Sequence, residues 1–181
     1  MIEKGKISQE PFIEILKTLE EAESANLVDW NAMNIASVDQ MNQPSSRMVL
    51  LKKISDDGLV FYTNYNSRKG KEIELNPKVA VNFWWRELKK QIRVEGFIEK
   101  ASEEDSDDYF NSRPLKSRVS AIISNQSSTI SSYEDLKNQI DNYLEQNDES
   151  SIKRPDHCGL YIVIPNAVEL WEERDNRTHE R

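Results

Sequence analysis

The sequence is poor in the residues that hold metals and disulfides, with one cysteine, Cys158, and two histidines among 181 residues. A lone cysteine excludes an internal disulfide, and with only His157 beside it Cys158 does not form a metal-binding cluster. We therefore expect no metal site, a buried or incidental thiol, and a reducing compartment.

Long apolar runs are also lacking. No stretch approaches the length of a membrane span, and the N-terminal residues MIEKGKISQE contain no apolar signal core. These two absences predict a cytoplasmic protein without a membrane segment.

Positive charge is scarce overall, because 24 Lys and Arg face 32 Asp and Glu and leave a net charge of −8. Such an acidic chain argues against a general binder of nucleic acid or of anionic membranes. Residues 45–93 differ, with eleven Lys and Arg against five Asp and Glu, a local balance of +6 that leaves −14 for the remainder. This uneven distribution favours a small anion as ligand of the segment, although local basic runs also arise by chance.

The periodic segments predict one domain over residues 1–181, mainly β with peripheral helices (α+β). Apolar residues at helical spacing from Phe12 to Ala22 predict a packing helix within residues 1–28, with Ser8 as a possible cap. Residues 31–100 contain five β-prone runs: AMNIASV, SSRMVLLK, GLVFYT, KVAVNFWW and QIRVEGFIEK. Sequential antiparallel strands with one short helix between the third and the fourth favour a small barrel over a parallel sheet.

The second half of the chain predicts helices first and strands afterwards. Capping boxes that begin at Ser102 and Ser132 mark helix starts within residues 102–146. In residues 157–181, the runs GLYIVI and AVELW on either side of Pro165 and Asn166 predict a hairpin. Composition alone predicts a frayed tail for the last residues, ERDNRTHER.

The helix that begins after Ser67 has cations in its first turn, Arg68, Lys69 and Lys71. The positive end of a helix dipole repels each of them by roughly 0.3 to 1 kcal/mol. A bound phosphate resolves the conflict, since it can also accept hydrogen bonds from the free backbone N–H groups. The alternative is a solvated basic helix start.

Two strands carry polar groups with a defined direction. In RMVLLK the middle residues are apolar on both faces of the pleat, which predicts burial on both sides, with Arg47 and Lys52 on opposite faces unless a bulge intervenes. In QIRVEG, Gln91 shares a polar face with Arg93 and Glu95, and that face meets either a polar ligand or solvent.

A third group follows the first capping box, where Tyr109 and Arg113 lie four residues apart before Pro114, with Ser117 in the next turn. Two hydroxyls and a guanidinium suit a phosphate monoester, which arginine binds in a bidentate manner. The alternative is a surface pair on one helical face.

Together and in this order, these segments resemble one family, the FMN-dependent pyridoxine (pyridoxamine) 5′-phosphate oxidases, from about residue 31 to residue 181. The resemblance rests on RMVLLK, FYTN followed by SRK, Gln91, YFNSRP with Ser117, NQSS, Trp171 and RTHER. It implies an FMN-binding split β-barrel that works as a homodimer with two flavins at the interface. The chain departs from the family pattern at Glu172, Glu173 and Arg174, where a Gln and two glycines are usual, and at Thr178 and Glu180, where Leu and Asp are usual.

The resemblance also implies site residues. FMN would be contacted by Arg47, Met48, Val49, Leu50, Leu51, Lys52, Tyr62, Thr63, Arg68, Lys69, Gln91, Gln126, Ser127, Trp171 and Arg181. The substrate phosphate would be held by Lys52, Tyr109, Arg113 and Ser117. Arg177 and His179 would flank the reacting carbon as catalytic residues, with Thr178 between them in the substrate site.

The implied reaction is the oxidation of pyridoxine or pyridoxamine 5′-phosphate to pyridoxal 5′-phosphate by hydride transfer to FMN, with O2 as final acceptor and H2O2 as product. The flavin carries the redox step, so the protein contributes orientation and electrostatics. Two alternatives stay open. One is a related flavin oxidase acting on another substrate, such as a phenazine precursor, and the other is a non-catalytic split barrel that binds flavin or haem.

Overall fold

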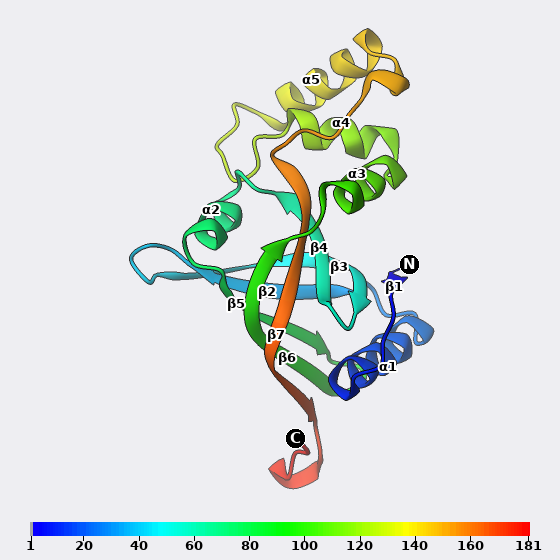
Figure 1. Cartoon of the computed structure of the whole chain (residues 1–181), viewed down its shortest axis with the longest axis vertical. Coiled ribbons are helices and arrows are strands. Elements are labelled where there is room, and N and C mark those ends of the chain that lie inside the picture. The colour runs from blue at the N-terminus through cyan, green and yellow to red at the C-terminus, as the bar shows by residue number, and fades with distance from the viewer. Residues whose placement is uncertain (1) are drawn as a thin grey trace. The chain divides into compact units, whose positions relative to one another are not determined.

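The computed structural model describes residues 2–181 and contains a closed antiparallel barrel of six strands (Figure 1). The strands follow one another in the order β3-β2-β5-β6-β7-β4, and pairing between β3 and β4 closes the ring. A short strand, β1, adds to the edge of β3 in parallel. The barrel expected from the sequence is therefore confirmed, and it is the scaffold of the split-barrel fold.

Five of the strands coincide with the runs read from the sequence. Their bounds are β2 (Ala32–Val38), β3 (Pro44–Ser55), β4 (Gly58–Asn64), β5 (Lys78–Trp85) and β6 (Lys90–Lys100), with β1 at Glu3–Lys4 and β7 at Cys158–Glu172. Burial alternates along β2, β5 and the first half of β6, because each presents one face to the barrel interior. Phe61, Phe83 and Ile92 are among the largest side chains of this core.

The first helix, α1 (Glu10–Ser24), buries Phe12, Ile15, Leu19 and Ala22 as its spacing predicts. Ser8 does not cap it, so that prediction is wrong. The hydroxyl and the backbone N–H of Ser8 instead donate to the Asp56 carboxylate in the β3–β4 turn. These hydrogen bonds lower the pKa of Asp56 and tie the start of α1 to that turn.

The remaining helices are α2 (Arg68–Leu75), α3 (Glu103–Ser112), α4 (Leu115–Ile123) and α5 (Tyr133–Gln146), with single 3-10 turns at Glu149–Ser151 and Asp175–Arg177. The predicted helix starts at Ser102 and Ser132 are confirmed, because each serine hydroxyl accepts a hydrogen bond from the backbone N–H three residues on, at 3.0 Å. Helices α3, α4 and α5 lie together (Figure 1) and bury Phe110, Val119 and Ile140 in a common apolar cluster.

The predicted C-terminal hairpin is wrong, because β7 runs without a turn from Cys158 to Glu172. Proline lacks a backbone N–H but favours an extended φ, so Pro165 removes a ladder hydrogen bond without reversing the chain. On the neighbouring strand a Cβ at Gly96 would lie 2.1 Å from the Ile164 carbonyl oxygen. Glycine there allows the two backbones to pass closely where β7 carries its proline.

Strand β3 also differs from its expected burial on both faces. Met48 and Leu50 are 61% and 41% exposed, so within one chain only the inner face is covered. The pairing of β3 with β4 shifts register between Leu51 and Lys53. Because of this bulge, the alternation of side chains between the two faces of β3 cannot be counted from Arg47 through to Lys52, which is the exception that the prediction from the sequence allowed for.

The chain forms two compact units. The first comprises residues 1–61, 72–99 and 161–181, and the second comprises residues 62–71 and 100–160. The first contains most of the barrel and α1, and the second contains α3, α4 and α5. A single domain over the whole chain stays a prediction. None of the helices within residues 2–181 is long and apolar enough to span a membrane.

Candidate functional site

The first unit holds a cluster around Arg47, which we call the arginine cluster and define as Arg47, Ser37, Ser45 and Glu72. Ser37 and Ser45 are opposite each other in the β2–β3 ladder, and Arg47 lies two residues further along β3 on the same face. Arg47 Nη2 lies 3.0 Å from Glu72 Oε2, and its Nη1 donates to Ser37 Oγ at 2.5 Å. Beyond Arg47, strand β3 carries the predicted contacts Met48 to Lys52.

The second unit holds the start of α2. Ser67 is fully buried and caps the helix, since its hydroxyl accepts from the Gly70 N–H at 3.3 Å and its carbonyl accepts from the Lys71 N–H at 3.0 Å. Lys69 is only 7% exposed, and its Nζ donates to Gln126 Oε1 at 2.7 Å. Thr63 Oγ1 donates to the same oxygen at 3.3 Å.

Three predicted cofactor contacts of this unit, Thr63, Lys69 and Gln126, are thus brought together by hydrogen bonds. Arg68 lies exposed in the first turn of α2, and Ser127 lies in the loop after α4 with a φ of 70°. Of the three predicted cations at this helix start, Lys69 is buried, whereas Arg68 and Lys71 are exposed.

The second unit also contains a cavity of about 280 Å³, which we call the tyrosine cavity. It is lined by Tyr62, Thr63, Asn64, Arg113, Ser120, Ala121, Ser124, Gln126 and Cys158. The Arg113 guanidinium carbon lies 4.9 Å from the centre of the Tyr62 ring, and the Tyr109 and Tyr62 ring centres lie 5.0 Å apart. Tyr62 therefore connects two residues predicted to bind the substrate phosphate.

Two polar atoms at the tyrosine cavity are buried without a hydrogen-bond partner within residues 2–181, the Tyr62 hydroxyl and Arg113 Nη1. Burial raises the pKa of the Tyr62 phenol, and Arg113 lowers it by a smaller amount. Burial likewise raises the pKa of the Cys158 thiol. Both groups are therefore neutral near pH 7, and Arg113 is left as the cation of this cavity.

Ser117 lies in the first turn of α4 and, like Tyr109, does not line the tyrosine cavity. Arg113 follows the last residue of α3 in extended conformation, so it ends the helix rather than continuing the face of Tyr109. The ring contact with Tyr62, not helical spacing alone, brings Tyr109 and Arg113 together.

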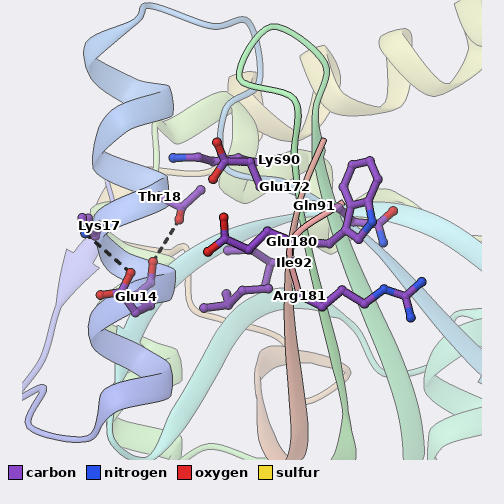
Figure 2. Close-up of a pocket in the computed structure, with 11 residues that line it drawn as sticks. Glu14, Lys17, Thr18, Lys90, Gln91, Ile92, Glu172, Glu180 and Arg181 are labelled. Atoms are coloured by element: carbon purple, nitrogen blue, oxygen red, sulfur yellow. Dashed lines mark hydrogen bonds and ion pairs between the residues drawn. The ribbon is translucent and has the colours of Figure 1, made fainter. Parts of the chain in front are cut away.

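A second cavity, of about 310 Å³, lies in the first unit between α1, β6 and the C-terminal residues, and we call it the tryptophan cavity. Its lining includes three predicted cofactor contacts, Gln91, Trp171 and Arg181. Figure 2 shows that Glu180 points toward α1, whereas Gln91 and the Arg181 guanidinium point away from that helix. The α1 side therefore carries charges of both signs, with Lys17 and Lys90 beside the glutamates, and the two predicted flavin contacts share the opposite side.

The C-terminal residues fold back onto β7, so the frayed tail expected from composition is wrong. Backbone hydrogen bonds of 3.0 and 3.1 Å join Glu172 and Glu180, and Arg174 forms ion pairs with both carboxylates, at 3.1 and 2.9 Å. His179 packs on Trp171 with ring centres 4.6 Å apart, and its Nδ1 accepts from the Arg174 N–H at 3.2 Å.

The two predicted catalytic residues differ in how they are held by this turn. Arg177 is exposed and has a positive φ of 61°, as has Asn176 at 55°. The hydroxyl of Thr178 donates to the Asp175 carbonyl at 2.7 Å. His179 is thus exposed but packs on the Trp171 ring, whereas Arg177 is positioned by the backbone of a tight turn.

Sequence reasoning missed several residues of these clusters, chiefly Glu72, Ser37 and Ser45. One signal was present: Ser37 continues the buried series Met33 and Ile35 along β2, and a hydroxyl at the third inward position needs a polar partner. Cys158 was expected to be a buried or incidental thiol and is buried, but nothing in its sequence surroundings indicates that it lines a cavity with Arg113.

Comparisons with known proteins agree with this architecture. A family model described as pyridoxamine 5′-phosphate oxidase matches residues 19–146. The chain is 46% identical over 176 residues to a pyridoxine/pyridoxamine 5′-phosphate oxidase of Nostoc sp. (strain PCC 7120), covering 97% of this chain and 82% of the relative. A second such oxidase, from Hydrogenovibrio crunogenus, is 41% identical over 180 residues. That match covers 99% of this chain and 84% of the relative.

Two solved structures share the fold. One is PhzG from Burkholderia lata 383 in complex with tetrahydrophenazine-1-carboxylic acid, with a TM-score of 0.89, 25% identity, and coverage of 95% of this chain and 84% of that one. The other is a pyridoxamine 5′-phosphate oxidase-related, FMN binding protein from Nostoc punctiforme, with a TM-score of 0.72, 17% identity, and coverage of 96% and 97%.

Proposed function

The chain belongs to the pyridoxamine 5′-phosphate oxidase family, and on that premise we propose that it is an FMN-dependent oxidase of pyridoxamine or pyridoxine 5′-phosphate. The product is pyridoxal 5′-phosphate, O2 is the electron acceptor, and H2O2 is the second product. The observation that carries the proposal is the pair of buried polar atoms at the tyrosine cavity.

A phosphate monoester accounts for that pair. Arg113 Nη1 and the Tyr62 hydroxyl are both hydrogen-bond donors, both are buried, and neither has a partner within residues 2–181. A buried donor left without an acceptor costs about 1 to 3 kcal/mol, so the pair favours a ligand rich in acceptors. Tyr109 supports the position of Tyr62 by ring contact, and Ser117 and Lys52 are the further phosphate contacts of the proposal.

In this proposal FMN would be held by Arg47 and Lys69, whose cations would meet its phosphate, and by Gln91, whose amide would meet a polar ring edge. When bound, FMN supplies a two-electron acceptor for oxidation at C4′ of the substrate and passes the electrons to O2. The residues of the chain hold and orient the two ligands, and no side chain has to act as a strong base.

Arg177 and His179 are the residues that we place beside the reacting carbon. The packing of His179 on Trp171 and the hydrogen bond that its Nδ1 accepts favour one orientation of the ring, which helps to orient a substrate. Thr178 completes the substrate contacts of this turn. The guanidinium of Arg177 can stabilise negative charge on the substrate oxygen or ring.

The active form in this proposal is a homodimer with flavin at the interface. Met48, Leu50 and Trp84 are large apolar side chains that remain exposed on the outer faces of β3 and β5. The ladders β3–β2–β5–β6 place Met48, Trp84 and Gln91 on the same face of the sheet, because Met48 pairs with Asn34, Asn34 with Asn82, and Trp84 with Gln91. A second copy that covers this face would therefore also cover a proposed flavin contact.

A second candidate is a flavin oxidase that acts on a phenazine precursor. The likeness to PhzG, with a TM-score of 0.89, favours it. A carboxylate can also accept from Arg113 and from the Tyr62 hydroxyl, so these two donors do not distinguish the candidates. The distinction rests on which substrate reduces the flavin.

The test is reduction of the flavin-loaded protein under anaerobic conditions. Pyridoxamine or pyridoxine 5′-phosphate should abolish the visible absorbance of oxidised flavin, and admission of O2 should restore it with formation of H2O2. Unphosphorylated pyridoxine serves as the control and should react far more slowly. If a dihydrophenazine carboxylic acid bleaches the flavin and the phosphorylated vitamers do not, the second candidate replaces the first.

A further inference from the structure

Glu72 is a nearly buried carboxylate that the reaction itself does not use. It is 4% exposed, and its two oxygens accept from three side chains of the arginine cluster. Ser37 Oγ donates to Oε2 at 2.6 Å, Ser45 Oγ lies 2.9 Å from Oε1 and 2.7 Å from Oε2, and Arg47 Nη2 lies 3.0 Å from Oε2.

Counting the hydrogen-bond donors shows which way the hydroxyl protons of the cluster point. Each serine hydroxyl has one proton to donate, and both serines also accept from Arg47, Ser37 from Nη1 and Ser45 from Nη2. Both hydroxyl protons must therefore point at Glu72, which is the final acceptor of the network. Arg47 makes three contacts in it, so two of its five guanidinium N–H groups remain for another ligand.

The cluster fixes the position of Arg47 more than it stabilises the fold. A buried ion pair is weak evidence for stability, because removing both charges from water costs about as much as their attraction returns. Arg47 has a 22% exposed side chain, so it reaches the surface while Glu72 stays inside. A buried carboxylate that holds a partly exposed arginine side chain restricts the rotamers of that side chain before a ligand binds.

We propose that Glu72 is a positioning residue that holds Arg47 ready for the phosphate of FMN and thereby determines the preference for FMN over riboflavin. The inference rests on the proposed function, since it takes Arg47 as a contact of the flavin phosphate. Glu72 itself touches neither ligand in this scheme and acts through Arg47 alone.

An opposing effect has to be weighed, because the Glu72 carboxylate also repels a phosphate. Arg47 lies 3.0 Å from it and compensates its charge, and Ser37 and Ser45 donate to it as well. Loss of Glu72 would leave the Arg47 side chain free to turn into solvent. FMN would then have to restrict that side chain when it binds, which costs affinity. Weaker binding of FMN is therefore expected, not tighter binding.

The experiment is titration of flavin-free protein with FMN and, separately, with riboflavin, followed by quenching of flavin fluorescence. Glu72→Ala should weaken FMN about tenfold and change riboflavin affinity less than about twofold, because only FMN has the phosphate that Arg47 meets. Glu72→Gln keeps one acceptor oxygen and should lose only about threefold. Glu74→Ala removes an exposed glutamate of the same helix and should match the wild type.

A double variant tests the route of the effect. If Glu72 acts through Arg47, then Glu72→Ala should cause no further loss in the Arg47→Ala background, and the double variant Arg47→Ala/Glu72→Ala should bind FMN no more weakly than Arg47→Ala. Thermal unfolding of each flavin-free variant, together with the riboflavin titration, reports whether the barrel is intact. Should Glu72→Ala not fold, the Glu72→Gln and Ser45→Ala proteins supply the same comparison.

Three results would overturn the inference: equal loss of FMN and riboflavin affinity, additive losses in the double variant, or tighter FMN binding by Glu72→Ala. A wild-type protein that binds no flavin, or binds FMN no better than riboflavin, would remove the proposed function and the inference together. Normal FMN preference with sensitivity to Arg47→Ala but not to Glu72→Ala would remove the inference alone.

Discussion

Arg113 is the residue on which the assignment of a phosphorylated substrate depends most. Arg113→Ala should raise KM for pyridoxine 5′-phosphate by about 30-fold to 1000-fold, since loss of a bidentate phosphate contact costs about 2 to 4 kcal/mol. kcat should change little if the phosphate is bound equally in ground and transition states. Arg177→Ala should instead lower kcat. Steady-state kinetics of the two variants checks both expectations.

The matched control for Arg113→Ala is Lys116→Ala, three residues further along. Lys116 is exposed and pairs with Asp141 at 3.1 Å on the surface of the helical unit, so its loss should leave both kinetic constants unchanged. FMN content should equal that of the wild type in all three variants. Unchanged KM in the Arg113 variant would remove this residue from the substrate site.

Tyr62 couples the folding of the helical unit to pH. Burial raises the pKa of its phenol, so the folded state favours the neutral form. A group with a raised folded-state pKa contributes its stability below the unfolded-state value, here 10.0, and loses that contribution as the pH rises further. The free energy of unfolding should therefore fall above about pH 10, by at most about 1.4 kcal/mol per pH unit for this group.

Denaturant unfolding of flavin-free protein between pH 8 and pH 11 measures this effect. Tyr62→Phe should show a shallower decline in stability than the wild type at the alkaline end. Tyr133→Phe removes an exposed phenol and should follow the wild-type curve. Parallel curves for the wild type and Tyr62→Phe would contradict the link between this phenol and alkaline unfolding.

At the scale of elements, the start of α2 offers a test of what a helix cap does beyond stability. Ser67→Ala removes the hydroxyl that accepts from Gly70 and that lies 3.2 Å from Lys69 Nζ, so it should cost about 1 to 2 kcal/mol of stability and weaken FMN binding severalfold. Ser102→Ala removes the exposed cap of α3 and should cost about 1 kcal/mol without changing FMN affinity.

Thermal unfolding and flavin titration of the two cap variants separate the roles. Equal effects of both variants on FMN would mean that the α2 start contributes only general stability. An Ser67→Ala protein with unchanged FMN affinity would exclude this helix start as part of the cofactor site.

Local signals predicted most elements, and long-range contacts decided those that failed. The β-prone runs from residue 32 to residue 100 alternate or end in turn residues, so their strands could be located from the sequence. Pro165 was interpreted as a turn because sequence alone does not show Gly96 on the neighbouring strand. Ser8 was interpreted as a cap because its actual partner, Asp56, lies 48 residues away.

The same division applies to the candidate sites. Motif resemblance identified Tyr109 and Arg113, and the structure shows that they meet through Tyr62, which was expected only as a flavin contact. Glu72 escaped notice because a glutamate in KGKEIEL has the composition of any exposed helix. Its burial depends on the packing of that helix against two serines of β2 and β3, which no local pattern reports.

At the scale of the whole molecule, the exposed apolar face of β3 and β5 predicts association. Met48→Glu places a charge on a side chain that is 61% exposed in one chain and buried in the proposed homodimer, so it should shift the protein to monomers and lower its FMN content. Met41→Glu is the matched control, because Met41 is 81% exposed in the β2–β3 turn, away from this face. Sedimentation velocity with flavin absorbance checks both variants.

A wild-type monomer that retains one FMN per chain would contradict the dimer and the shared site together. Dissociation by Met41→Glu but not by Met48→Glu would mean that the turn, not the strand face, forms the interface.

The interleaving of the two compact units restricts how this chain can exchange parts with its relatives. The backbone passes from one unit to the other after residues 61, 71, 99 and 160. A single crossover in a chimeric gene therefore always divides at least one unit between two parents. A cassette of residues 62–160 would transplant the tyrosine cavity intact but would carry all of β5 and β6 with it. Transfer of substrate preference between family members should thus succeed with two short inserts, residues 62–71 and 100–160, and fail with one long one.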